Sequence, residues 1–157
     1  MVPAEFETLY REHSDAVYRS AFRILGSAED AEDVLQTVFL RFLRRDPGQQ
    51  QIDQPEYYLR RSAVNAALDL IRSRQAKSSP KLSLVDLPAE PSQNAQQELR
   101  IRLRAALATL EPRWAEVFTL RYIEGFGNKE IAALLDMSQA LVAVILFRSR
   151  QKLQKEL

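Results

Sequence analysis

The sequence predicts an all-α fold: two small helical domains joined by a flexible linker, the C-terminal one a helix-turn-helix. Apolar residues recur at helical spacing along most of the chain, and the alternation typical of strands is nearly absent. Glycine, which interrupts helices, occurs only four times. Residues 78–94 contain three prolines among polar residues and separate two helical stretches, which predicts a tether between two lobes.

Three helices are expected in the N-terminal lobe. The first ends at Gly26, and Ser27 is suited to cap the second, with Asp30 as the acid of a capping box. The second helix is expected over about Ala28–Arg44. Pro55 marks the start of the third helix, whose distal half is basic.

Four helices are expected in the C-terminal lobe. They cover about residues 96–110, 114–123, 129–135 and 139–157. Asn128 and Ser138 are expected to cap the last two helices, which a tight turn at 136–138 joins.

Composition excludes several classes of function. The net charge of +1 gives no general attraction for nucleic acid, so a DNA-binding surface must come from local clustering. With no cysteine and one histidine, His13, the sequence offers no disulfide and no metal site. It also lacks a glycine-rich phosphate loop and a catalytic histidine cluster, so we expect neither enzyme activity nor a cofactor.

The N-terminus lacks the basic start and the apolar run of a secretion signal. No window approaches the roughly 18 apolar residues of a membrane span. We therefore expect a cytoplasmic protein without membrane insertion.

Residues 129–153 carry a clear structural pattern. A short helix, a three-residue turn and a longer helix have the spacing of a helix-turn-helix. The residues expected to pack the two helices together are Ile131, Ala132, Leu135, Val142, Leu146 and Leu153. Taken alone, the pattern fits either a DNA-reading motif or a plain helical hairpin.

Residues 110–122 (LEPRWAEVFTLRY), 124–126 (EGF) and 130–132 (EIA), followed by Ser138 and Val142, form an ordered series of motifs. Together they resemble the C-terminal domain of extracytoplasmic-function sigma factors of bacterial RNA polymerase. The resemblance implies that this domain reads the −35 promoter element. The residues implied to contact −35 DNA are Asn128, Lys129, Ser138, Gln139, Ala143, Arg148 and Arg150.

Residues 30–41 (DAEDVLQTVFLR) place two carboxylates and an amide along one helix face. Such a face can bind an arginine-rich partner, although a solvated acidic face has the same pattern. The segment resembles the polymerase-binding helix of the same family, which implies docking on the clamp coiled coil of the polymerase β′ subunit. The implied docking residues are Asp30, Asp33, Gln36, Thr37, Phe39 and Leu40.

Residues 58–74 (YLRRSAVNAALDLIRSR) combine arginines, which neutralise phosphates, with an asparagine and an aromatic that can hold an unstacked base. A basic, solvated helix end is the simpler explanation of the charges alone. The segment resembles the family region that melts and holds the −10 element. The residues implied to contact −10 DNA are Tyr58, Arg61, Asn65, Asp69, Arg72 and Arg74.

The resemblance covers nearly the whole chain and implies three parts. Residues 1–77 bind core polymerase and the −10 element, residues 78–95 form the linker, and residues 96–157 bind the −35 element. The implied function is to direct RNA polymerase to promoters and to assist DNA opening in transcription initiation. The implied partners are core RNA polymerase through its β′ clamp and β subunit, promoter DNA, and an anti-sigma regulator.

The last helix departs from the family pattern because residues 139–147 (QALVAVILF) carry no charge. Helical geometry turns Val142, Leu146, Ser149 and Leu153 toward the core and Ala140, Ala143, Val144 and Phe147 outward. Base edges and phosphates need donors and acceptors, whereas exposed apolar surface usually marks a protein contact. Asp136 also replaces a glycine common in the family, although aspartate tolerates the left-handed conformation.

Two alternatives follow from the uncharged face. The chain can be a sigma-like adapter whose C-terminal domain binds a protein partner rather than −35 DNA. Alternatively, the linker or the N-terminal lobe covers the face in a compact, autoinhibited form.

Overall fold

The computed structural model describes residues 4–45, 54–77 and 95–157, which form helices and no strand, confirming the all-α fold class. The helices of the N-terminal lobe are α1 (Ala4–Leu25), α2 (Ala28–Leu43) and α3 (Pro55–Lys77). Those of the C-terminal lobe are α5 (Ala95–Thr109), α6 (Pro112–Tyr122), α7 (Asn128–Leu135) and α8 (Gln139–Glu156). Residues 78–94 of the expected linker, 78–95, lie outside the described residues, and its last residue, Ala95, is instead the first residue of α5.

The turn between α1 and α2 follows the sequence prediction. Gly26 adopts a φ of 69°, which favours glycine, and a Cβ there would also collide with the guanidinium of Arg104. Ser27 caps α2, because its Oγ accepts a 3.2 Å hydrogen bond from the backbone N–H of Asp30. The carboxylate of Asp30, which we expected to complete a capping box, binds Arg74 of α3.

The expected helix-turn-helix is present in α7 and α8. The cap of α7 is Gly127 and not Asn128, which is the first helical residue. Asp136 adopts the left-handed conformation at φ 54°, and Ser138 caps α8 as predicted. The two helices meet at 109°, within the range usual for this motif.

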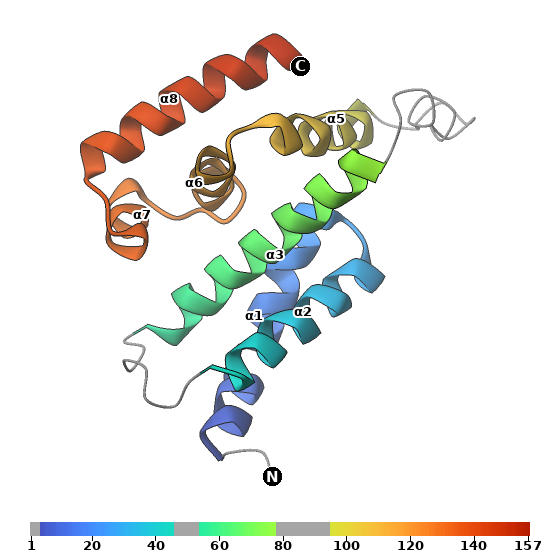
Figure 1. The fold of residues 1–157 in the computed structure, drawn as a ribbon, viewed down its shortest axis with the longest axis vertical. Coiled ribbons are helices and arrows are strands. Elements are labelled where there is room, and N and C mark those ends of the chain that lie inside the picture. The colour runs from blue at the N-terminus through green and yellow to red at the C-terminus, as the bar shows by residue number, and fades with distance from the viewer. Residues whose placement is uncertain (1–3, 46–53, 78–94) are drawn as a thin grey trace.

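The buried apolar residues of the two lobes form one core cluster, and α3 lies between α1 and α2 on one side and α5 and α6 on the other (Figure 1). Leu59, Val64 and Leu68 of α3 are fully buried in the first lobe. The four positions of α8 expected to face the core, Val142, Leu146, Ser149 and Leu153, are all buried. The C-terminal lobe therefore uses the face of α8 that the apolar periodicity predicts.

Among the described residues, no single helix has the length and apolar character needed to cross a bilayer. Only α7 and α8 taken together pass that test, across the bend between them.

Two buried serines are expected to respond oppositely to replacement by alanine. Ser149 has no hydrogen-bond partner in the part of the chain that the structure describes, so Ser149→Ala should leave the free energy of unfolding unchanged or raise it by about 1 kcal/mol. The hydroxyl of Ser20 donates to the buried carboxylate of Glu124, so Ser20→Ala should lower that free energy by about 1–3 kcal/mol. Urea unfolding of both variants measures the difference, and a larger loss for Ser149→Ala would contradict the roles assigned to the two hydroxyls.

Candidate functional site

The expected docking residues of α2 divide between the surface and the core. Asp33, Gln36 and Leu40 are exposed, and Asp30 and Thr37 are partly exposed. Phe39 is only 3% exposed, and its ring packs edge-on against Phe6 and Tyr10, with ring centroids 6.0 and 4.9 Å away. This burial corrects the assignment of Phe39 as a docking contact: the ring holds α1 against α2 beneath the exposed face.

Asp30 connects that face to the C-terminal end of α3. Both carboxylate oxygens accept hydrogen bonds of 2.7 Å from the two Nη atoms of Arg74. The hydrogen bonding from Arg74 holds the pKa of Asp30 below its ordinary value, although partial burial acts in the opposite direction. One residue expected to bind polymerase therefore pairs with one expected to bind −10 DNA.

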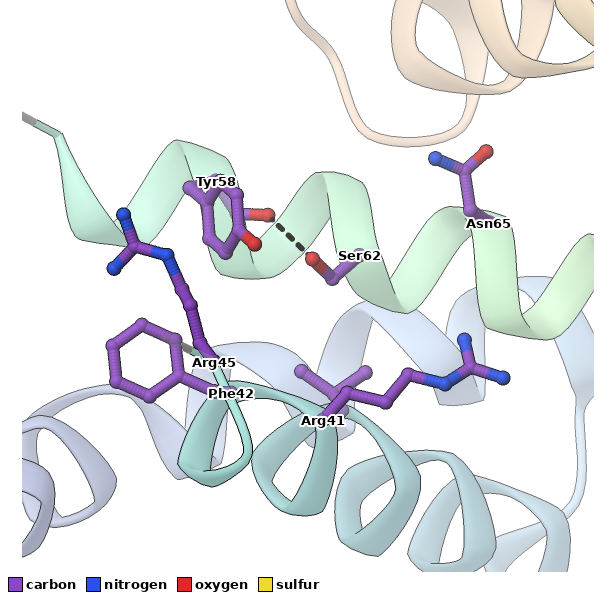
Figure 2. A pocket seen from close by; sticks show the side chains of 7 residues that line it. Arg41, Phe42, Arg45, Tyr58, Ser62 and Asn65 are labelled. Carbon is purple, nitrogen blue, oxygen red and sulfur yellow. Dashed lines mark hydrogen bonds between the residues drawn. The ribbon is translucent and has the colours of Figure 1, made fainter. Parts of the chain in front are cut away.

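A pocket of about 400 Å³ lies between α2 and α3 (Figure 2). Its lining residues are Val38, Arg41, Phe42, Arg45, Tyr58, Ser62 and Asn65. The rings of Phe42 and Tyr58 meet edge-on at 6.4 Å, and the guanidinium of Arg45 lies 5.8 Å from the centre of the Phe42 ring. Aromatic faces beside arginines and an amide are the groups that bind single-stranded nucleic acid.

The α2 side of this pocket was missed by sequence reasoning. Val38, Arg41, Phe42 and Arg45 follow one another at i, i+3, i+4 and i+7, so they share one helix face. That spacing could have identified them, but which helix they face depends on tertiary packing.

The remaining expected −10 residues are mostly engaged by carboxylates. Glu116 of α6, which is 5% exposed, accepts hydrogen bonds of 2.6 Å from Arg61 Nε and 2.8 Å from Asn65 Nδ2. On the distal part of α3, Arg72 pairs with Asp69 at 2.8 Å. The structure thus brings two expected −10 residues against the C-terminal lobe.

Glu124, just after α6, forms a second contact between the lobes, and its side chain is fully buried. Arg23 of α1 donates to its two oxygens at 2.9 and 3.0 Å, Arg60 of α3 donates at 3.1 and 3.2 Å, and Ser20 donates as well. Burial alone would raise the pKa of Glu124, but the hydrogen bonds from Arg23 and Ser20 and the nearby positive charges hold it below its ordinary value.

The expected −35 residues lie on α7 and α8 and are largely accessible. Lys129, Ser138, Gln139, Ala143, Arg148 and Arg150 are exposed or partly exposed. Asn128 is partly exposed and accepts a 3.2 Å hydrogen bond from Arg121 Nε, while Arg150 donates to the hydroxyl of Tyr122. The set forms an interrupted polar surface around the centre of α8.

That centre is apolar and open. Val144 and Phe147 are 45% and 55% exposed, and Ala140 and Ala143 are exposed too, as the helical pattern predicted. The alternative in which the N-terminal lobe covers this face is therefore wrong, because the lobes meet through α5 and α6. The other version of this alternative, in which the linker covers the face, concerns residues that lie outside those described.

Two family models match the chain: Sigma-70 region 2 over residues 9–77 and Sigma-70, region 4 over residues 100–153. The chain is 34% identical to the RNA polymerase sigma-E factor of Streptomyces avermitilis, covering 98% of this chain and 85% of that protein. It is also 34% identical to the ECF RNA polymerase sigma factor SigE of Mycolicibacterium smegmatis, covering 95% of this chain and 60% of that protein.

Among solved structures, the chain is similar to the extracytoplasmic function sigma factor SigJ of Mycobacterium tuberculosis. The TM-score is 0.48 at 21% identity, covering 95% of this chain and 52% of that one.

Acid is expected to weaken the contact at Glu124. Because the folded state holds the pKa of Glu124 below its ordinary value, this carboxylate stabilises the fold fully above about pH 4.3, and the contribution is lost as the pH falls through the lower folded pKa. The groups that face its carboxylate are the hydroxyl of Ser20 and the guanidinium groups of Arg23 and Arg60. As the pH is lowered from about 7 to 3, urea unfolding should therefore show a smaller decrease in the free energy of unfolding for Glu124→Gln than for the unmodified chain. Identical pH profiles would contradict this role.

Proposed function

The chain belongs to the extracytoplasmic-function sigma factors of bacterial RNA polymerase, and we propose that three surfaces on its helices carry out their work. It directs RNA polymerase to promoters for transcription initiation, with the polymerase and promoter DNA as partners. The observation that carries this conclusion is the match to regions 2 and 4 in chain order. We infer that the chain positions the polymerase in the cytoplasm and performs no catalytic step itself.

The first surface is the docking face of α2, formed by Asp30, Asp33, Gln36, Thr37 and Leu40. Its carboxylates suit an arginine-rich partner, and Leu40, which is 50% exposed, supplies an apolar anchor. Phe39 supports the face from beneath. We assign this face to the β′ clamp coiled coil, and we place a further contact on the β subunit by family resemblance alone.

The second surface is the pocket between α2 and α3, which we assign to an unpaired base of the −10 strand. Its volume of about 400 Å³ is sufficient for one base, and Phe42 and Tyr58 provide aromatic surfaces. The amide of Asn65 can read a base edge, while Arg41 and Arg45 can neutralise the adjacent phosphates. In this proposal residues 1–77 bind polymerase and hold the melted −10 strand, and residues 78–94, which precede α5, form the linker.

The third surface lies on α7 and α8 within residues 96–157, and we assign it to −35 DNA. Lys129, Arg148 and Arg150 can contact phosphates, and Gln139 can reach a base edge at the start of α8. Val144 and Phe147 can contact thymine methyl groups. An adapter without promoter recognition is not favoured, because the region 4 match over residues 100–153 includes every residue assigned to −35 DNA.

An anti-sigma regulator is proposed as a further partner. The proposal rests on family membership alone.

Reconstituted transcription tests the proposed function. Core polymerase supplied with the purified chain should bind it and give run-off transcripts from a subset of promoters in a genomic library. Leu40→Asp should weaken core binding about tenfold by removing an interface anchor, whereas Glu7→Gln, at an exposed position on α1, should not. Failure of the chain to bind core polymerase, with no inhibitor present, would overturn the proposal.

The pocket gives a separate prediction. Tyr58→Ala should reduce open-complex formation about 5- to 150-fold, because stacking on an aromatic side chain contributes about 1–3 kcal/mol per base. Core binding should be unchanged, and Gln75→Ala, at an exposed position near the end of α3, is the matched control. Permanganate footprinting of the −10 region measures the opening, and unchanged opening by Tyr58→Ala would exclude the pocket as the base site.

A further inference from the structure

The lobes meet on the side of α3 that carries Arg61 and Asn65. Asn65 is assigned to the −10 strand in the proposed function, and Arg61 was expected to contact the same strand, yet both donate to the nearly buried carboxylate of Glu116. Asn65 also lines the pocket assigned to the unpaired base. We propose that the C-terminal lobe closes over this surface through Glu116 and Glu124, so that the unbound chain is autoinhibited. This closure rests on the proposed function, because it presumes that the covered surface binds DNA.

Glu124 fixes the closed arrangement at a second point. Its carboxylate lies between Arg23 and Arg60, and Arg60 also donates to its backbone carbonyl at 2.9 Å. The adjacent Phe126 ring lies 4.5 Å from the guanidinium of Arg60 and 5.0 Å from the ring of Tyr57. Several groups on one helix face of α3 therefore hold the C-terminal lobe in place.

Two further contacts lie on either side of this centre. The hydroxyl of Tyr57 donates to Glu130 at the start of α7 at 2.7 Å. On the side of α1, Arg104 Nε donates to the carbonyl of Ile24 at 2.8 Å, where the helix dipole favours a cation. The closure thus extends from α1 along α3 to the helix-turn-helix.

The chemistry of these contacts allows exchange with DNA. An arginine binds carboxylate and phosphate oxygens with the same hydrogen-bonding geometry, so a DNA strand can take the place of Glu116 on Arg61. After the exchange the arginine stays paired and the released carboxylate is hydrated, so neither charge is left buried alone. Contacts of this polar kind within a chain are typical of lobes that separate during function.

The same exchange makes closure and strand binding mutually exclusive. A ligand shifts the equilibrium between the closed and open arrangements of the lobes only if it binds one of them more tightly. A single DNA strand bound to Arg61 and Asn65 requires the open arrangement, because Glu116 occupies both residues in the closed one. The closed state therefore reduces the apparent affinity of the unbound chain for DNA by the fraction of molecules that are open. Weakening the two carboxylate contacts should increase that fraction.

Distance measurements test the closure directly. The chain has no cysteine, so spin labels can be placed at Glu32→Cys on α2 and Gln151→Cys on α8, both exposed. Electron–electron resonance should give a narrow distance distribution that broadens in Glu116→Gln/Glu124→Gln. The matched control Glu98→Gln/Glu156→Gln, with the same change in charge at exposed sites, should keep the narrow distribution.

Strand binding without polymerase supplies the second readout. The probe is a fluorescein-labelled single strand of mixed sequence, followed by anisotropy. The double variant should bind it about tenfold more tightly than the unmodified chain, although neither substituted residue is assigned to DNA. Circular dichroism verifies that the variant remains helical, and Glu116→Gln alone provides the same test with Glu124 intact.

A charge exchange identifies the pair responsible. Glu116→Arg should broaden the distance distribution, and adding Arg61→Glu should narrow it again. A broad distribution in the unmodified chain, or unchanged strand affinity in the double variant, would overturn the closure. Run-off transcription distinguishes the two failures, because normal initiation alongside either result would refute the closure and leave the proposed function intact.

Discussion

The buried carboxylate of Glu124 determines how the two lobes sit against each other. A charge removed from water needs partners, and Glu124 has two guanidinium groups and a hydroxyl, from Arg23, Arg60 and Ser20. Those partners belong to two different helices of the first lobe, so a single side chain fixes the position of the C-terminal lobe against both α1 and α3. The other contacts between the lobes surround this one.

Helix α3 contacts a different lobe with each of its two faces. Its apolar face, with Leu59, Val64 and Leu68, is buried against the first two helices, while Arg60, Arg61 and Asn65 face the other lobe. An apolar face of this kind stays packed whichever partner is present, because its burial does not depend on the polar side. The helix can therefore exchange a carboxylate for another anion without rearrangement of the core.

Most local features were predictable from the sequence, although the cap of α7 is Gly127 and not the expected Asn128, and features that depend on packing were not predictable. Ser27, Ser138 and Asp136 act within one helical turn, so residue type alone indicated their roles. The burial of Phe39 depends on rings supplied by α1. The bonds of Glu116 and Glu124 join residues 51 to 104 positions apart, a separation at which hydrophobic periodicity carries no information.

The pair formed by Asp30 and Arg74 connects two surfaces with different proposed partners. Under these assignments, a polymerase that engages Asp30 competes with Arg74 for the same two oxygens and so alters the electrostatic environment at the end of α3 that is expected to contact −10 DNA. Thermodynamic reciprocity then requires the promoter strand to change the affinity for polymerase by the same factor. Under the proposed assignments, this one ion pair couples polymerase binding to promoter-strand binding.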